Sequence, residues 1–166
     1  MQSHDSYFKL RTQPPTPHDE VCQCHGSKPV KLMYALTENP IHCIDCNLEV
    51  APDALAPDSQ LVEDLVAWRN VYAVIYRLWL DSGADETWAK HQLVDIQSTV
   101  NTQGLAVRAA ADHLRPCYLW YFQDQSDDAF TLLQQCPNCD RPFTRYSNGI
   151  FPQFICAQCK IITVGE

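Results

Sequence analysis

The stretch that decides the fold is Cys136-Pro-Asn-Cys139 together with Cys156-Ala-Gln-Cys159, near the C-terminal end of the chain. Sixteen residues separate these two Cys-x-x-Cys pairs, which is within the roughly 15–20 residues typical of the two halves of a tetrahedral zinc site. Each pair turns the backbone so that two thiolates reach one ion at about 2.3 Å, and such soft ligands favour Zn²⁺. The spacing therefore predicts a zinc site with four cysteine ligands.

The segment between these two pairs predicts a β-hairpin. Within it, Asn148-Gly149 supplies residues that tolerate the positive φ of a tight two-residue turn. Pair, hairpin and pair together predict a zinc ribbon over residues 135–166. Four reduced or disulfide-bonded cysteines without a metal ion are the alternative interpretation of the same residues.

The composition of the whole chain indicates a small metal-binding protein. The chain has 166 residues, of which 46% are hydrophobic, so it is long enough for one domain with a core of its own. It contains no run of eighteen apolar residues and no N-terminal secretory signal. Nine cysteines without a secretory signal predict metal binding in a reducing cytoplasm rather than a disulfide framework.

A second group of cysteines precedes the middle of the chain and predicts a second zinc site. Its members are Cys22, Cys24, Cys43 and Cys46. The apolar segment 30–37 lies between the two pairs and is predicted to be a strand. A Cys-x-Cys pair leaves less room for the usual turn than Cys-x-x-Cys, so Cys22 is the ligand that a neighbouring histidine, His25 or His42, would replace. Two zinc ions per chain are expected.

A long helix is predicted to follow. It begins at Asp58 or Ser59, and Gly83 suits the left-handed position that ends it. Its apolar residues recur at spacings of three and four and predict one buried face. This face comprises Leu61, Leu65, Trp68, Tyr72, Ile75 and Trp79.

Two further helices are predicted over residues 84–96 and 101–114, followed by a buried, aromatic-rich strand over residues 117–122. Cys117 has no cysteine partner nearby and is predicted to be a reduced thiol in the core. The predicted fold class is α+β, with a helical middle, a few strands, an N-terminal four-cysteine zinc site and a C-terminal zinc ribbon. The predicted divisions are a disordered lead (1–17), an α+β body with the first zinc site (18–134) and the C-terminal ribbon (135–166).

The net charge limits the classes of ligand. It is −8 at pH 7, from twelve Lys and Arg against twenty Asp and Glu, and thiolates bound to zinc make it more negative. Proteins that bind duplex DNA neutralise phosphates with Lys and Arg, so broad binding to duplex DNA is not expected. Only the ribbon interleaves basic and aromatic side chains. Its residues predicted to contact a partner are Arg141, Phe143, Arg145, Tyr146 and Phe151.

The order of these parts resembles a bacterial zinc-ribbon family of unknown function, for which nucleic-acid binding has been suggested. The resemblance covers about residues 20–164 and implies the same succession of elements. It is carried by Cys22-Gln-Cys24, residues 39–46, the helix with Trp68 and Tyr72, residues 118–121, and the ribbon from Cys136 to Cys159. The chain departs from the family in lacking most of a longer N-terminal portion and in having Asp140 where a glycine is expected.

No catalytic motif is recognised. Zinc sites with four cysteine ligands have no open coordination position, and the chain contains no Gly-rich phosphate loop, His-Glu-x-x-His or His-x-Glu signature. Catalysis is therefore not expected, although carboxylates such as Glu63 and Asp64 leave a general base in some unrecognised cleft as an alternative.

Three non-catalytic functions fit the sequence. The acidic charge favours a protein-interaction module with a basic protein partner, for example an adaptor, a regulator or an immunity protein that neutralises a toxin. The second function is binding of single-stranded nucleic acid through the ribbon hairpin. The third is a thiol-based redox switch, because the Cys-x-Cys and Cys-x-x-Cys ligand set is similar to that of the redox-regulated heat-shock chaperone. No membrane partner is expected.

Overall fold

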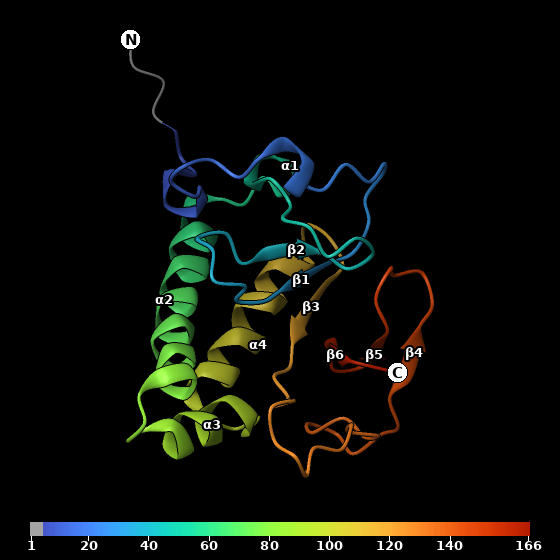
Figure 1. Ribbon diagram of the computed structural model, residues 1–166. Coiled ribbons are helices and arrows are strands. Elements are labelled where there is room, and N and C mark those ends of the chain that lie inside the picture. The colour runs from blue at the N-terminus through green and yellow to red at the C-terminus, as the bar shows by residue number, and fades with distance from the viewer. Residues whose placement is uncertain (1–4) are drawn as a thin grey trace.

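The protein, seen in a computed structural model that describes residues 5–166, has an α+β fold built on one six-stranded mixed sheet (Figure 1). The strands are β1 (Val30–Leu32), β2 (Ile41–Cys43), β3 (Cys117–Trp120), β4 (Thr144–Tyr146), β5 (Gln153–Cys156) and β6 (Ile161–Val164). Their order is β2-β1-β3-β6-β5-β4. The two central pairings, β1 with β3 and β3 with β6, are parallel, and the outer ones are antiparallel. The predicted fold class is confirmed.

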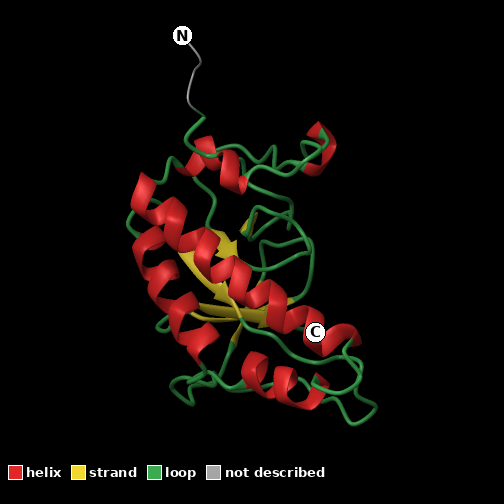
Figure 2. Ribbon diagram, turned by 90° about the vertical axis from the view of Figure 1, so that its left-hand side faces the viewer, coloured by secondary structure: helices red, strands yellow, loops and turns green. Residues whose placement is uncertain are grey.

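Two long helices cover one face of this sheet, with shorter helices at their ends, as Figure 2 shows. The chain has four α-helices in residues 5–166. They are α1 (Pro52–Leu55), α2 (Ser59–Asp81), α3 (Glu86–Val94) and α4 (Thr99–Asp112), with short 3-10 turns η1 (Phe8–Leu10) and η2 (His18–Glu20) before them. Side-chain caps fix two of the helix starts, because Asp58 accepts a hydrogen bond from the Leu61 N–H at 2.8 Å and Ser98 accepts one from the Asn101 N–H at 3.3 Å. None of the helices within residues 5–166 is long and apolar enough to cross a membrane.

The apolar face predicted for the long helix is confirmed as core. Trp68 and Tyr72 are buried, and Trp79 is half-buried at the end of the face. The indole N–H of Trp68 donates to the Val100 carbonyl at 3.1 Å, which satisfies its one polar group and joins α2 to α4. Gly83 takes the expected left-handed conformation, with φ of 70°. These contacts place α2 and α4 over the centre of the sheet.

The positions and lengths of the strands differ from those predicted from the sequence more than the helices do. The strand predicted over residues 30–37 ends at Leu32, because the chain turns away through a loop in which Leu36 has φ of 60°. Strands β2 and β6 were not predicted at all. Each is short and flanks a cysteine pair, so local patterning gives little sign of it, and each is stabilised by pairing with a neighbouring strand.

The ribbon hairpin is confirmed as β4 and β5, but the tight turn at Asn148-Gly149 is wrong. Residues 147–152 form a longer loop, and Gly149 does not take a positive φ. Its role is close approach instead, since a Cβ atom there would lie 2.8 Å from the Gln153 amide nitrogen and 3.4 Å from the Ile44 carbonyl oxygen. The loop bends because it packs on the turn that follows β2.

The sheet runs across the predicted boundary between body and ribbon. Strand β3 of the body pairs with β6 of the ribbon in the register Leu119↔Ile161 and Trp120↔Ile162. The two predicted units therefore share one sheet, and their independent unfolding stays a prediction.

The predicted disordered lead is ordered in the part that the structure describes, while residues 1–4 lie outside it. Leu10 is fully buried in the core beneath the helices. Arg11 forms ion pairs with Asp5 at 2.8 Å and with Asp53 at 2.7 Å. The segment was predicted to be disordered because its sequence has no periodicity. A single buried leucine and a few ion pairs hold it in place without a long helix or strand.

Candidate metal centres

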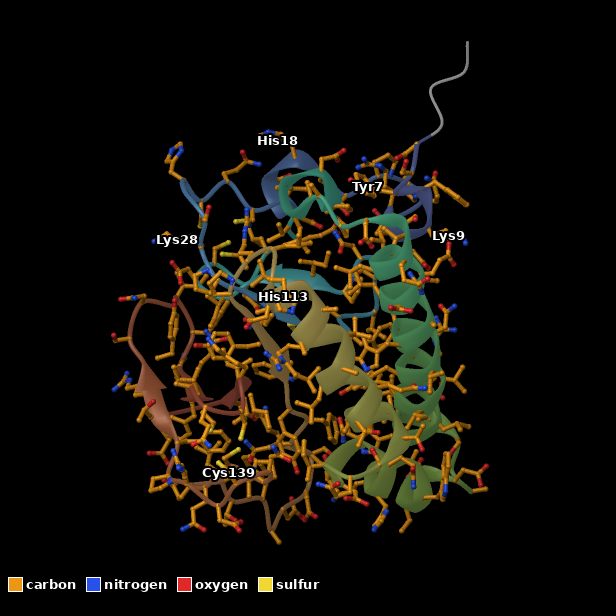
Figure 3. All side chains as sticks on the ribbon, turned by 180° about the vertical axis from the view of Figure 1, so that it is seen from behind. Tyr7, Lys9, His18, Lys28, His113 and Cys139 are labelled. Atoms are coloured by element: carbon orange, nitrogen blue, oxygen red, sulfur yellow. The ribbon has the colours of Figure 1, made fainter. Side chains whose placement is uncertain are left out.

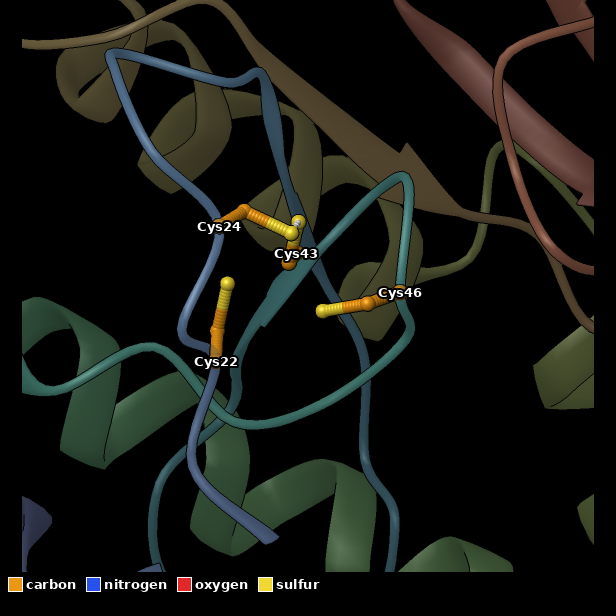
Figure 4. A group of neighbouring side chains, drawn as sticks. All are labelled: Cys22, Cys24, Cys43 and Cys46. Atoms are coloured by element: carbon orange, nitrogen blue, oxygen red, sulfur yellow. Dashed lines mark hydrogen bonds between the residues drawn. The ribbon is translucent and has the colours of Figure 1, made fainter. Parts of the chain in front are cut away.

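The N-terminal centre brings together Cys22, Cys24, Cys43 and Cys46 (Figure 4). Their sulfur atoms all lie within 4.8 Å of one another, and those of Cys24 and Cys43 are 4.0 Å apart. A disulfide bond would need about 2.05 Å, whereas four thiolates around one ion at about 2.3 Å lie roughly 3.8 Å apart. The group therefore has the spacing of a tetrahedral metal site and can hold a metal ion.

Two different backbone arrangements supply these ligands. Cys43 ends β2, and Cys46 lies in the turn after it, where the Asn47 N–H donates to the Cys43 carbonyl at 3.0 Å. Cys22 and Cys24 lie on an extended segment held by the Cys22 N–H, which donates to the Glu49 carbonyl at 2.7 Å. One half of the centre is thus a hydrogen-bonded turn, and the other is an extended segment held by a backbone hydrogen bond to Glu49.

The C-terminal centre brings together Cys136, Cys139, Cys156 and Cys159. Their sulfur atoms also lie within 4.8 Å of one another, and those of Cys139 and Cys156 are 3.7 Å apart. Both pairs form hydrogen-bonded turns, with the Asp140 N–H donating to the Cys136 carbonyl at 2.9 Å and the Cys159 N–H donating to the Cys156 sulfur at 3.5 Å. Figure 3 shows Cys139 at the end of the molecule away from Lys28, which lies beside the N-terminal centre.

A left-handed residue follows each Cys-x-x-Cys pair. Asn47, Asp140 and Lys160 have φ of 62°, 56° and 55°. Glycine is the usual residue in this conformation, and another residue costs about 1 kcal/mol or more, with a lower cost for Asn and Asp, whose short polar side chains hydrogen-bond locally. The sequence marked only Asp140 as a departure from the expected glycine. The structure shows that the turn keeps its geometry there and that the same feature recurs in the other two turns.

Burial and backbone hydrogen bonds act in opposite directions on these thiols. Burial raises the pKa of Cys46 and of Cys136, whereas the N–H of Arg141 lowers the pKa of Cys139. A metal ion displaces any remaining thiol protons when it binds, so its affinity falls as the pH falls. Cys117 belongs to neither centre, and burial raises the pKa of its thiol to about 12. It is a reduced thiol in the core, as predicted.

Neither alternative histidine joins the N-terminal group. His42 lies on β2 opposite Lys31 of β1, and both side chains are buried on the face of the sheet away from the helices. Burial lowers the pKa of His42 to about 3 and that of Lys31 to about 8. Lys31 donates to the Gln153 amide oxygen at 2.7 Å and lies over the Trp120 ring at 4.7 Å. No pattern in the sequence marks a lysine in a three-residue strand as buried.

The hairpin loop of the ribbon is fastened to the N-terminal centre. The Tyr146 hydroxyl donates to the Asp45 carboxylate, and the Ile150 N–H donates to the Asp45 carbonyl at 2.8 Å. The Gln153 amide donates to the Ile44 carbonyl at 2.9 Å. Asp45 and Ile44 are the two residues between Cys43 and Cys46. The end of the hairpin farthest from the C-terminal cysteines is therefore held by the turn of the other centre (Figure 1).

The residues predicted to contact a partner are only partly available for contact. Arg141, Arg145 and Phe151 are exposed. Phe143 is half-buried and stacks on Phe154 with ring centroids 6.5 Å apart, and Tyr146 is half-buried and bonded to Asp45. Ile150 was not predicted, although its side chain is 68% exposed beside Phe151 at 52%.

Comparisons with protein families, curated proteins and solved structures found no match to this chain. The resemblance to the bacterial zinc-ribbon family therefore rests on the order of the cysteine pairs and the elements between them. The structure itself shows two four-cysteine groups that can each hold a metal ion.

Proposed function

We propose that this protein is a non-catalytic zinc-binding protein that acts as a protein-interaction module through the end of its ribbon hairpin. Zn²⁺ is the metal because all eight ligands are cysteines at tetrahedral spacing. Four thiolates fill the coordination sphere of each ion, so the metals support the fold and have no position for a substrate.

The observation that carries this proposal is the exposed pair Ile150 and Phe151, which we call the hairpin tip. These two large apolar side chains are 68% and 52% exposed and adjacent in the chain, and contiguous exposed apolar surface marks interaction sites. They lie on a loop that is held by hydrogen bonds to Asp45 and Ile44. The loop is therefore already ordered before a partner binds, and binding does not incur the entropic cost of ordering it. An apolar pair on a pre-ordered loop is typical of the centre of a protein interface.

The charge of the chain favours a basic protein partner. A net charge of −8 steers a basic partner toward the protein and repels an acidic one. Arg145 beside the tip is the exception, and it fits an acidic group at the edge of the same interface.

Binding of single-stranded nucleic acid is the second candidate, because Arg141 and Arg145 are both exposed on the hairpin. Its stacking surface is small, however. Phe143 stacks on Phe154 and Tyr146 bonds to Asp45, which leaves Phe151 as the exposed ring among the predicted contacts. The few cations limit the salt dependence of such binding to about two or three ion equivalents.

Metal content is the first test. Elemental analysis of the purified protein should give two zinc ions per chain. One zinc per chain would contradict the N-terminal site, and iron in place of zinc would indicate an electron-transfer protein.

Affinity capture from native lysate, with and without nuclease, tests the function. The captured partner should be a protein that survives nuclease treatment, and the double variant Ile150→Ser/Phe151→Ser should lose it. Leu114→Ser, at an apolar residue that is 49% exposed outside the hairpin, is the matched control and should retain it. Arg141→Ala/Arg145→Ala should also retain it. Salt-sensitive oligonucleotide binding that disappears in the arginine variant would instead establish the second candidate.

A further inference from the structure

A cleft of about 390 Å³ lies where the parallel strands β1 and β3 end. Residues 33–36, which directly follow β1, form one side of it, and residues after β3 form another. The C-terminal half of α2 forms the third side. The carboxyl ends of parallel strands are frequent ligand sites, and this volume is that of a small-molecule site.

Aromatic rings form half of the lining of this cleft. They are Tyr34, Tyr72, Tyr76, Trp79, Trp120 and Phe122. None of the residues that line the cleft is charged, and Gln123, Gln125 and Ser126 supply polar groups at one side. The hydroxyls of Tyr34, Tyr72 and Tyr76 make no hydrogen bond to another of residues 5–166. The cleft therefore offers ring faces and hydroxyl groups but no ionic partner.

The rings meet at steep angles. Tyr34 and Tyr76 are 5.5 Å apart at 68°, Tyr76 and Trp79 are 5.2 Å apart at 61°, and Trp79 and Phe122 are 4.8 Å apart at 75°. A flat ligand is best enclosed between two parallel rings, and the nearly parallel pair here, Tyr72 and Tyr76 at 22°, comes from successive turns of one helix. Rings at steep angles instead point their faces in different directions, which suits a rounded group better than a flat one.

We propose that this cleft binds a trimethylammonium group through cation–π interactions. Such a group is rounded, carries a diffuse positive charge and is attracted by the faces of several aromatic rings at once. Lys31 already lies over Trp120, so the rings left for the ligand are those of Tyr34, Tyr76, Trp79 and Phe122.

The net charge of the chain agrees with a cationic ligand. The chain carries −8, and no lysine or arginine lines the cleft to attract an anion. Asp124 lies in the sequence between the lining residues Gln123 and Gln125, and its carboxylate forms an ion pair with Lys90 at 2.9 Å. The ring faces therefore supply the attraction at short range, and the net charge raises the local concentration of cations.

Two sources share this chemistry: a free small molecule such as choline, and a trimethylated lysine side chain of another protein. The zinc-loaded protein is titrated by calorimetry and tryptophan fluorescence with choline, with its neutral isostere 3,3-dimethylbutan-1-ol, and with indole as a flat neutral probe. Choline should bind at least about tenfold more tightly than either neutral probe. A trimethyllysine peptide and its unmethylated form then distinguish the two sources.

Variants locate the site. Trp79→Leu should weaken choline binding at least about tenfold, whereas Tyr76→Phe, which keeps the ring, should change it by less than about threefold. Trp88→Leu, at an exposed tryptophan on α3, is the matched control and should have no effect. Zinc content and circular dichroism show whether each variant folds. Equal affinity for choline and its neutral isostere, no binding of any trimethylammonium probe, or full binding by a folded Trp79→Leu protein would each overturn the proposal.

Discussion

The two four-cysteine centres have the same ligands but different support. In the C-terminal centre both cysteine pairs lie in hydrogen-bonded turns, one of them between β5 and β6, and Cys136 and Cys156 are buried. In the N-terminal centre one pair lies on an extended segment, and Cys24 is exposed. The N-terminal centre gains its support from outside, through the hairpin loop that bonds to Asp45 and Ile44. Equal ligand sets therefore do not imply equal stability or equal reactivity.

The largest effect is expected from removing a ligand of the self-supported centre. Cys139→Ser should abolish metal binding there, because it removes one of the four thiolate ligands. A structural zinc contributes on the order of 10 kcal/mol to the folding of a small site, and this contribution is lost with the metal. The ribbon should unfold while α2 and α4 keep their packed face. Elemental analysis and circular dichroism measure both results, with Cys117→Ala as the control at a cysteine outside either centre. Loss of all structure in one step would show that body and ribbon unfold as one unit.

The next effect concerns the order in which the centres lose metal. During stepwise oxidation with peroxide, the N-terminal centre should release its metal first, because thiolate accessibility governs oxidation and Cys24 is exposed. Metal release measured with a chromophoric chelator, combined with mass spectrometry of alkylated cysteines, should place the first modification at Cys22 or Cys24. Early modification of Cys136 or Cys156 would contradict the difference between the centres. The expected order is also what a redox switch in this protein would require.

A smaller effect is expected from cutting the link between the hairpin and the N-terminal centre. Tyr146→Phe removes the hydroxyl that donates to Asp45 and should cost about 2 kcal/mol of unfolding free energy. It should also speed metal release from the N-terminal centre while leaving the C-terminal one unchanged. Tyr118→Phe is the matched control, since that hydroxyl makes no hydrogen bond to another of the described residues. Equal acceleration at both centres, measured by chelator competition, would show that the link is not specific.

The smallest effect is expected at the turns themselves. Asp140→Gly should raise the unfolding free energy by at most about 1 kcal/mol, because glycine adopts the φ of 56° without strain but adds conformational entropy to the unfolded chain. Ala157→Gly, at a residue of the neighbouring turn without a positive φ, should lower it by a few tenths to about 1 kcal/mol. Thermal unfolding of the zinc-loaded protein measures both. A loss of stability in Asp140→Gly would mean that the aspartate side chain, and not only its backbone, supports the turn.

The features that could be predicted from sequence are those encoded over short distances. Cysteine spacing identified both groups, because the two members of each pair are close in sequence and a local turn fixes three of the four pairs. The apolar face of α2 with Trp68 and Tyr72 followed from its helical period. What could not be predicted depends on partners far along the chain. Strand β6 exists through its neighbours β3 and β5, and the loop containing Gly149 takes its shape from contact with Ile44.

Features of the sites that depend on residues far apart in the sequence could not be predicted either. Asn148-Gly149 favours a tight turn when considered alone, and only the distant turn at Ile44 explains why a longer loop forms. Lys31 would be expected on the surface, but Gln153 and Trp120 surround it in the folded protein. The aromatic residues that line the cleft were predicted in part as core, and the cleft itself arises only where α2 meets the ends of β1 and β3.

The fastening of the hairpin also sets the order in which the chain folds during its synthesis. Asp45 and Tyr146 are 101 residues apart, and Lys31 and Gln153 are 122 residues apart. The N-terminal cysteines leave the ribosome long before the segment that supports them, so their metal can be bound first and secured only at the end. Until β6 is synthesised, the side of β3 away from β1 is an unpaired edge, on a strand that carries Tyr118 and Trp120. A chain truncated within the ribbon is therefore expected to aggregate instead of forming a smaller working protein.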